Sequence, residues 1–124
     1  MISKQQNLFK EITSGEEEIC NTSIRSGQVI EAKGRSVIIF GNVNSGAEIR
    51  AGRSIYVFGN INGRVFAGCD SPKPNLERIT FFGGKPEALQ IGNLLITADD
   101  LANATFTKPM VATIVSSTIN LSEI

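Results

Sequence analysis

Short apolar runs separated by glycines make up the middle of this chain. Between residues 24 and 68 glycine recurs every few positions, and β-branched or aromatic residues are frequent in the intervals. Alternate positions are apolar in GRSVIIFGNVN (34–44) and in GRSIYVFGNIN (52–62), and the apolar periodicity of a helix is absent from this region. The pattern predicts short strands joined by tight corners.

The two quoted segments are successive copies of one repeat with a period of 18 residues. A third copy, ITFFG (79–83), follows a polar, proline-containing insertion, CDSPKPNLE, which is predicted to be an external loop. Three strand-like segments fit in each period, so the repeat predicts a three-sided solenoid of parallel strands. The predicted inward ladders are Val37, Ile55 and Ile79; Ile39, Val57 and Phe81; Val43 and Ile61; Ile30, Ile49 and Val65; and Ala32, Ala51 and Ala67.

The spacing alone leaves the handedness of this solenoid open. Apolar residues spaced by six between Val37 and Ala67 are typical of the left-handed hexapeptide helix of many acyltransferases. That spacing fails at Glu31 and after Cys69, and equivalent positions are offset by 19, 18 or 16 residues on different sides, which favours an irregular right-handed coil. Beyond Gly92 the repeat fades, and the remaining strands are predicted to cap the open end.

One side of the solenoid is apolar on its outer surface as well. If the ladder residues of the first side point inward, the residues next to them point outward. All of these outward residues except Thr80 are apolar or aromatic: Ile38, Phe40, Tyr56, Phe58, Thr80 and Phe82. A patch of this size is too large to face water in a soluble protein. We expect a self-complementary, two-fold dimer interface, with cover by the terminal segments as the alternative. The predicted interface residues are Ile38, Phe40, Tyr56, Phe58 and Phe82.

Composition argues against several classes of function. Twelve Lys and Arg balance twelve Asp and Glu, so no broad basic surface is available for nucleic acid. The chain has no histidine, the usual general base of hexapeptide acyltransferases, and it shows no nucleophile–base pair. We therefore expect no catalytic residues. Cys20 and Cys69 lie outside any Cys or His cluster, so neither a metal site nor a cofactor is expected.

The two lone thiols are typical of a reducing compartment. The first twenty residues are polar and lack the apolar core of a secretory signal, and no apolar run reaches the length of a membrane span. The sequence therefore predicts a cytoplasmic protein.

Three short motifs occur in order on the repeat. They are Arg25-Ser26-Gly27-Gln28, Ser45-Gly46-Ala47-Glu48, and GRVFAG at 63–68. Together they resemble the C-terminal domain of the septum-site-determining protein MinC, although Val65 stands where that family often has Ala. EALQIGNLLITADDL (87–101) resembles the family's last strand and cap more loosely. The resemblance extends over about residues 22–124.

This resemblance implies an all-β fold, a right-handed three-sided parallel β-helix with a C-terminal cap. The β-helix domain would occupy residues 24–124, after a polar leader or linker at 1–23. It also implies a non-enzymatic regulator of septum placement that homodimerises and binds MinD, a membrane-associated ATPase. The protein would then reach the inner face of the membrane only through that partner. The implied ATPase contacts are Arg25, Ser26, Gly27 and Gln28, extended by Gly46 and Arg64.

In the MinC family a separate N-terminal domain precedes the β-helix and antagonises the tubulin-like division protein. Here 23 residues precede it, so we expect either part of a longer protein or a short relative. The tubulin-like protein is a further partner only in the first case. The structural alternative is a self-assembling scaffold of the bactofilin kind, whose end-to-end stacking would require bare terminal turns.

Overall fold

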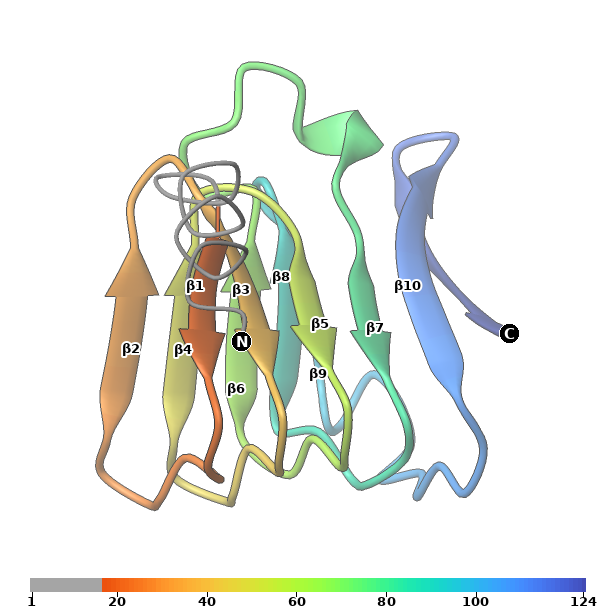
Figure 1. Ribbon diagram of the computed structural model, residues 1–124. Coiled ribbons are helices and arrows are strands. Elements are labelled where there is room, and N and C mark those ends of the chain that lie inside the picture. Colours follow the sequence, from red (N-terminus) through yellow and green to blue (C-terminus); the bar gives the residue numbers. More distant parts are fainter. Residues whose placement is uncertain (1–16) are drawn as a thin grey trace.

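The computed structural model describes residues 17–124, which form a coil of short β-strands and one 3₁₀ turn (Figure 1). The elements are β1 (Glu17–Cys20), β2 (Val29–Ala32), β3 (Ser36–Ile39), β4 (Glu48–Ala51), β5 (Ile55–Val57), β6 (Arg64–Ala67), η1 (Pro74–Leu76), β7 (Ile79–Phe81), β8 (Ala88–Ile91), β9 (Leu94–Thr97), β10 (Met110–Val115) and β11 (Thr118–Glu123).

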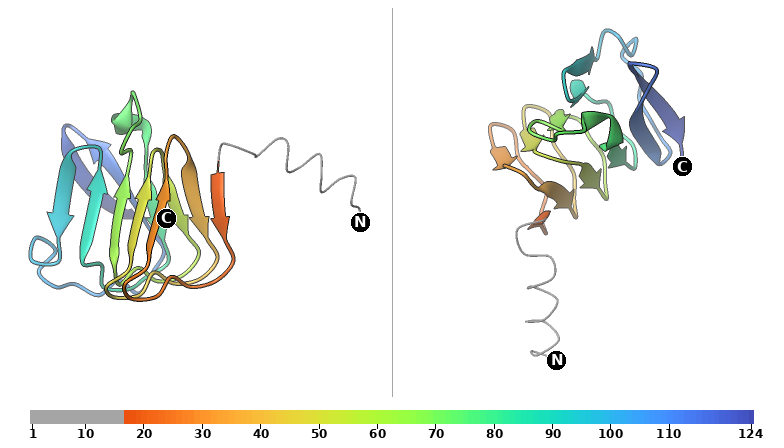
Figure 2. Two further views of the ribbon diagram at one scale, coloured as in Figure 1. Left: turned by 90° about the vertical axis from the view of Figure 1, so that its left-hand side faces the viewer. Right: turned by 90° about the horizontal axis from the view of Figure 1, so that it is seen from above.

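Two sheets form two sides of the coil. One has the order β1-β3-β5-β7-β10-β11 and the other β2-β4-β6-β8-β9. Single bridges from Ile24 to Val43 and from Val43 to Ile61 form the third side. The chain passes along a strand of the first sheet, crosses the third side, and returns along the second sheet (Figure 1). Figures 1 and 2 together show that the coil is right-handed, as expected from the family resemblance.

The strand registers confirm the predicted ladders. Val37 pairs with Ile55, and Ile55 pairs in turn with Ile79. In the second sheet Ile49 lies between Ile30 and Val65. The inward side chains from Val37 to Phe81 are almost fully buried, and burial of each Val or Ile contributes about 1.5–3 kcal/mol. The core is therefore one column of stacked aliphatic residues.

The coil begins earlier than the expected boundary at residue 24. Strand β1 pairs in parallel with β3, with Ile19 opposite Ile38. Glu18 occupies the inward position of this strand, opposite Val37. A charged residue there breaks the apolar alternation by which a strand is recognised in the sequence. A carboxylate is tolerated there because β1 is the edge strand of its sheet within residues 17–124, and Glu18 pairs with Arg35 at 2.9 Å. Residues 1–16 of the predicted leader lie outside the described part of the chain.

The cap forms as predicted at the C-terminal end. Strand β9 runs antiparallel to β8, and β10 runs antiparallel to β7 and to β11. Met110 and Ala112 of β10 are buried against the core. Because these antiparallel strands end the parallel stack, the bare last turn that a bactofilin-like polymer needs is missing at this end. The structure therefore gives no support to the scaffold alternative.

The insertion after the third turn is an external loop, as predicted, and it projects beyond the strands (Figure 1). Its base is fastened by Glu77, whose carboxylate accepts hydrogen bonds from Ser54 Oγ and Ser71 Oγ, each at 2.8 Å. Glu77 and Ser54 are both buried. The loop thus joins the top of the third turn without disturbing the ladders.

Candidate functional site

Two turns that carry the sequence motifs lie side by side where the third side meets the second sheet; the first is exposed, and the second exposes only Ser45 fully. We call them the motif corners: residues 25–28 of the first turn and 44–47 of the second. Gly27 N donates to Gly46 O at 3.0 Å, which joins the two corners directly. Both glycines have positive φ, +86° and +84°, a backbone conformation that other residues adopt only at an energetic cost. The structure thus brings Ser26, Gly27 and Gly46 together, as predicted.

The first motif corner closes on itself. Gln28 N donates to Arg25 O at 3.0 Å, and Arg25 N donates to Gln28 Oε1 at 2.6 Å. All four residues of the corner are exposed. Among residues 17–124, no atom beyond its chain neighbours lies within 4 Å of a Cβ built on Gly27, so a partner can approach this backbone closely. Gln28 shapes the turn, while Arg25 presents a guanidinium at the surface.

Gly46 is constrained in a second way. A Cβ built there would collide with Ser26 Oγ of the neighbouring corner. A larger residue at this position would have to displace the Ser26 hydroxyl. The two corners therefore form one closely packed polar surface.

Arg64 lies farther along the second sheet, on β6 opposite Glu48. Its guanidinium is 3.5 Å from Glu48 Oε1, which forms an ion pair between successive turns, and Glu48 also accepts from Arg50 Nε at 2.6 Å. The Arg64 side chain is 47% exposed, so the pair contributes about 0–1 kcal/mol. Arg64 extends the polar surface rather than joining the motif corners.

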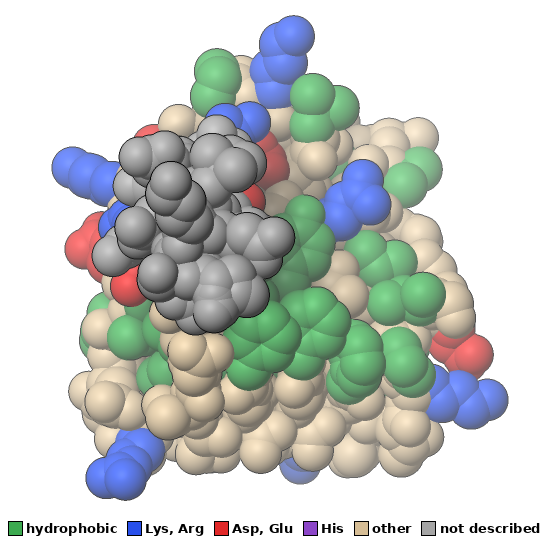
Figure 3. Space-filling view, in the orientation of Figure 1, with side chains coloured by type: hydrophobic (Ala, Val, Ile, Leu, Met, Phe, Trp, Pro, Cys, Tyr) green, Lys and Arg blue, Asp and Glu red, His purple; other side chains and the backbone are tan. Residues whose placement is uncertain are grey.

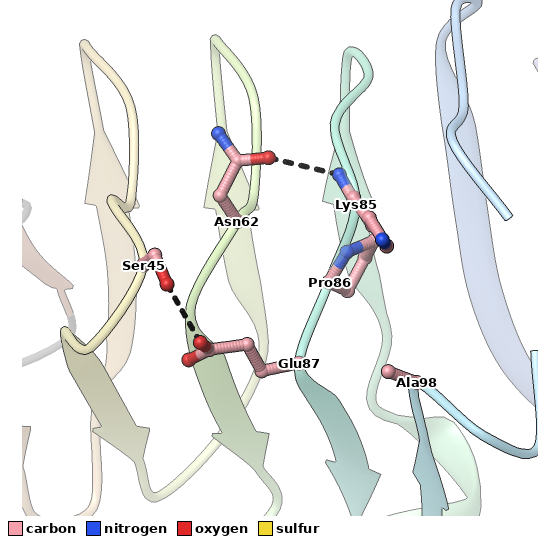
Figure 4. A pocket seen from close by; sticks show the side chains of 6 residues that line it. All are labelled: Ser45, Asn62, Lys85, Pro86, Glu87 and Ala98. Atoms are coloured by element: carbon pink, nitrogen blue, oxygen red, sulfur yellow. Dashed lines mark hydrogen bonds between the residues drawn. The ribbon is translucent and has the colours of Figure 1, made fainter. Parts of the chain in front are cut away.

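The third turn has a shortened corner. Val43 pairs with Ile61 and Glu48 with Arg64, so four residues of the second turn face two of the third. The third turn passes so close to the second that a Cβ on Gly63 would lie 2.5 Å from Asn44 O. Beside this corner lies a groove of about 370 Å³ (Figure 4). It is lined by Ser45, Asn62, Lys85, Pro86, Glu87 and Ala98.

Glu87 spans this groove and was not singled out from the sequence. Ser45 Oγ donates to Glu87 Oε2 at 2.7 Å (Figure 4), and Gly46 N donates to Glu87 Oε1 at 3.1 Å. The carboxylate thus reaches from the fourth turn back to the second motif corner. The signal for this contact is the 16-residue offset between Glu48 and Arg64, which shows that one corner has lost two residues.

The predicted dimer residues lie on the opposite side of the coil, on the first sheet. We call Ile38, Phe40, Tyr56, Phe58 and Phe82 the apolar face. The three phenylalanines are 43–49% exposed. Phe40 and Phe58 stack at 5.2 Å, and Phe82 meets Phe58 edge-on at 5.5 Å. Hydrophobic side chains gather across this sheet in Figure 3.

The row through Ile38 and Tyr56 is longer than predicted. Ile19 of β1 pairs with Ile38 at one end, and Val111 of β10 pairs with Thr80 at the other. Ile19 is 41% exposed. The apolar face is therefore flanked by further aliphatic side chains on both sides.

The remaining candidate chemistry is structural in character. Asn60 N donates to Asn42 Oδ1 at 2.8 Å, which links equivalent corners of successive turns. Both cysteines are free thiols, and burial raises the pKa of each, so they are protonated and weakly nucleophilic at neutral pH. Within residues 17–124 there is no group of three or more Cys, Asp or Glu side chains placed to hold a metal ion. In the same range no helix is long and apolar enough to cross a bilayer.

Comparison with known sequences points to one family. A family model described as "Septum formation inhibitor MinC, C-terminal domain" matches residues 18–124. The chain is 39% identical over 100 residues to a "Probable septum site-determining protein MinC" of Clostridium perfringens (strain SM101 / Type A), covering 80% of this chain and 46% of that protein. It is 38% identical over 98 residues to a protein of the same name from Clostridium botulinum (strain Alaska E43 / Type E3), covering 79% and 44%. The chain therefore spans less than half the length of these relatives.

A solved structure has the same fold. A chain of the "MinC:MinD cell division protein complex" of Aquifex aeolicus superposes with a TM-score of 0.79 at 31% sequence identity. The match covers 88% of this chain and 87% of that chain. The family match begins at residue 18, within β1, in agreement with the early start of the coil.

Proposed function

Because the chain belongs to the family of the septum formation inhibitor MinC, which it matches through that family's C-terminal domain, we propose that it is a non-enzymatic regulator of division-site placement. In this role it homodimerises and binds a MinD-type ATPase. The observation that carries the proposal is the pair of motif corners, where the intact motif at 25–28 forms an exposed polar surface with open backbone. The similar solved structure, which is named as a complex with MinD, supports this choice of partner.

The motif corners suit recognition of a protein surface. Arg25 offers a permanently charged, directional hydrogen-bond donor. Gly27 allows a partner's backbone or side chain to approach the turn, because in the described part of the chain nothing lies within 4 Å of a Cβ built there. Arg64 and its Glu48 partner extend the polar surface along the second sheet.

The apolar face suits contact with a second copy of the chain. Aligned phenylalanine rings on a sheet lose unfavourable water contact when a matching sheet covers them. The face lies on the first sheet, whereas the motif corners border the second, so one surface remains free when the other is occupied. A dimer would present two copies of the ATPase site, and binding to the ATPase would carry the protein to the membrane. Binding to the tubulin-like division protein stays a prediction from the sequence.

The decisive experiment is capture of a MinD-type ATPase in the presence of ATP or of ADP. Wild type should bind with ATP, whereas Arg25→Ala and Gly27→Asp should bind about tenfold or more weakly, because each removes or blocks a contact at the motif corners. Circular dichroism and light scattering would show that each variant is folded and has the same mass.

Gly34→Asp is the matched control. Gly34 is also exposed, has a φ of +69° and has nothing within 4 Å of a built Cβ, but it lies at a different corner, between β2 and β3. It should bind like wild type. Equal binding by all four proteins would reject the site, and no binding by wild type with ATP would reject the ATPase as partner.

A further inference from the structure

We infer that Glu87 is a positioning residue that holds the motif corners in the shape the ATPase recognises. This inference rests on the proposed function. It adds a residue from the fourth turn, remote in sequence, to a surface that the motifs place on the first three turns. The residue acts through Ser45 and Gly46 rather than by touching the partner itself.

The need for Glu87 follows from the shortened corner of the third turn. In the first turn, Gly27 N donates to a backbone carbonyl of the second turn, Gly46 O. The equivalent acceptor for Gly46 N would be a carbonyl of the third turn. The corner of that turn is two residues shorter, so no residue of it lies opposite Gly46. An unpaired amide is costly at this half-buried position. The Glu87 carboxylate occupies the gap and accepts the bond.

Glu87 is itself held firmly. Its N–H donates to Gly63 O at 2.9 Å, and its carbonyl accepts from Ala98 N at 3.0 Å. Its side chain therefore projects from a fixed backbone across the groove to Ser45 (Figure 4). Hydrogen bonds to a carboxylate are stronger than those between neutral groups, so this contact limits movement of the second motif corner.

The effect extends to the first motif corner through a hydrogen-bond chain. Glu87 Oε1 accepts from Gly46 N, and Gly46 O accepts from Gly27 N. Because Ser26 packs against Gly46, a shift of the second corner also moves the first. Removing the carboxylate should therefore disturb Gly27 without any change to the motif at 25–28.

Asp70 provides a matched control on the same molecule. Its carboxylate also reaches back two turns and accepts from a backbone amide, Gly34 N, at 3.1 and 3.2 Å. That contact lies at the corner between β2 and β3, away from the motif corners. A general loss of carboxylate bridges would affect Asp70 and Glu87 variants alike.

The test measures affinity for the ATP-bound ATPase with three variants. Glu87→Ala should bind about tenfold or more weakly than wild type, since it leaves Ser45 and Gly46 without their acceptor. Glu87→Gln should stay within about threefold, because its amide oxygen accepts from Gly46 N and its NH₂ group donates to Ser45 Oγ. Asp70→Ala should also stay within about threefold.

Three results would overturn the inference: wild-type affinity in Glu87→Ala, an equal loss in Asp70→Ala, or an equal loss in Glu87→Gln. The last would mean that the charge itself contacts the partner. Amide hydrogen exchange by NMR supplies a second readout that needs no ATPase. Glu87→Ala should speed exchange at Gly46 and Gly27 about tenfold or more, whereas Asp70→Ala should do so at Gly34 only. If wild type fails to bind the ATPase, the proposed function fails, and unchanged exchange at Gly46 still rejects the positioning role.

Discussion

Gly27, Gly46 and Gly63 lie in adjacent corners, yet each is glycine for a different reason. Gly27 has positive φ and open space above it, whereas Gly46 has positive φ and packs against Ser26. Gly63 has no positive φ, and it is glycine because neighbouring carbonyl oxygens leave no room for a side chain. The same residue type therefore serves access, packing and close approach of the backbone.

This difference predicts unequal costs for alanine at two of these positions. Gly63→Ala should lower the free energy of unfolding by about 3 kcal/mol, because its Cβ would lie 2.5 and 2.6 Å from Asn44 O and Ala47 O. Gly27→Ala should lower it by only about 1 kcal/mol, the cost of the left-handed backbone alone. Urea denaturation would measure both, and equal losses would contradict the packing argument.

Residues that recur in the repeat were predictable, whereas those that break it were not. Arg25, Gly27 and Gly46 could be placed near one another because their motifs occupy equivalent positions of successive turns. Glu87 could not, because its contact depends on the missing residues beside Gly63. A sequence shows such a gap only as a changed offset, and the side chain that fills it is visible only in three dimensions.

Among the elements, the inner strands were predictable and the end strands only in part. Strands β3, β5 and β7 carry buried residues on alternate positions, since they lie between neighbours on both sides. Strand β1 is an edge strand within the described residues, where Glu18 can occupy an inward position, so its sequence pattern resembles a linker. The cap was expected, but its antiparallel pairing could not be deduced, because parallel and antiparallel end strands bury similar side chains.

The cap predicts a change in assembly when it is removed. Deleting residues 108–124 would expose the edge of β7 and the side chains that Met110 and Ala112 cover. Such an edge pairs with other chains. We expect species larger than a dimer in sedimentation velocity, while Val115→Lys, at an exposed position on β10, should behave like wild type. A deletion variant that sediments like the intact chain would show that β10 is dispensable as a cap.

For the whole molecule, the arrangement of surfaces matters more than any single contact. The apolar face and the motif corners border different sheets, so dimerisation and ATPase binding would not compete. A dimer would then engage two ATPase subunits at once, and the second contact would form at high effective concentration. Two ATPase-binding sites of low individual affinity would therefore suffice to hold the dimer on the ATPase.

Phe58→Glu should convert the dimer to a monomer, because it places a charge at the centre of the stacked rings of the apolar face. Light scattering should report half the wild-type mass. Phe66→Glu is the control, since Phe66 also points outward but lies on the second sheet. There the Arg50 guanidinium carbon lies 4.5 Å from the centre of the Phe66 ring. An unchanged mass in Phe58→Glu would mean that another segment covers the apolar face.

The shortened corner also bears on how a repetitive chain finds one register. The copies at 34–44 and 52–62 are so alike that a slip by one full turn during folding would keep most aliphatic contacts. Such a slip would separate Glu87 from Ser45 and Gly46, and Asp70 from Gly34, so it would break hydrogen bonds that reach back two turns. These irregular contacts form only in the native register, so they lower its free energy below that of the slipped registers. The irregular corner thus helps to specify the strand register during folding.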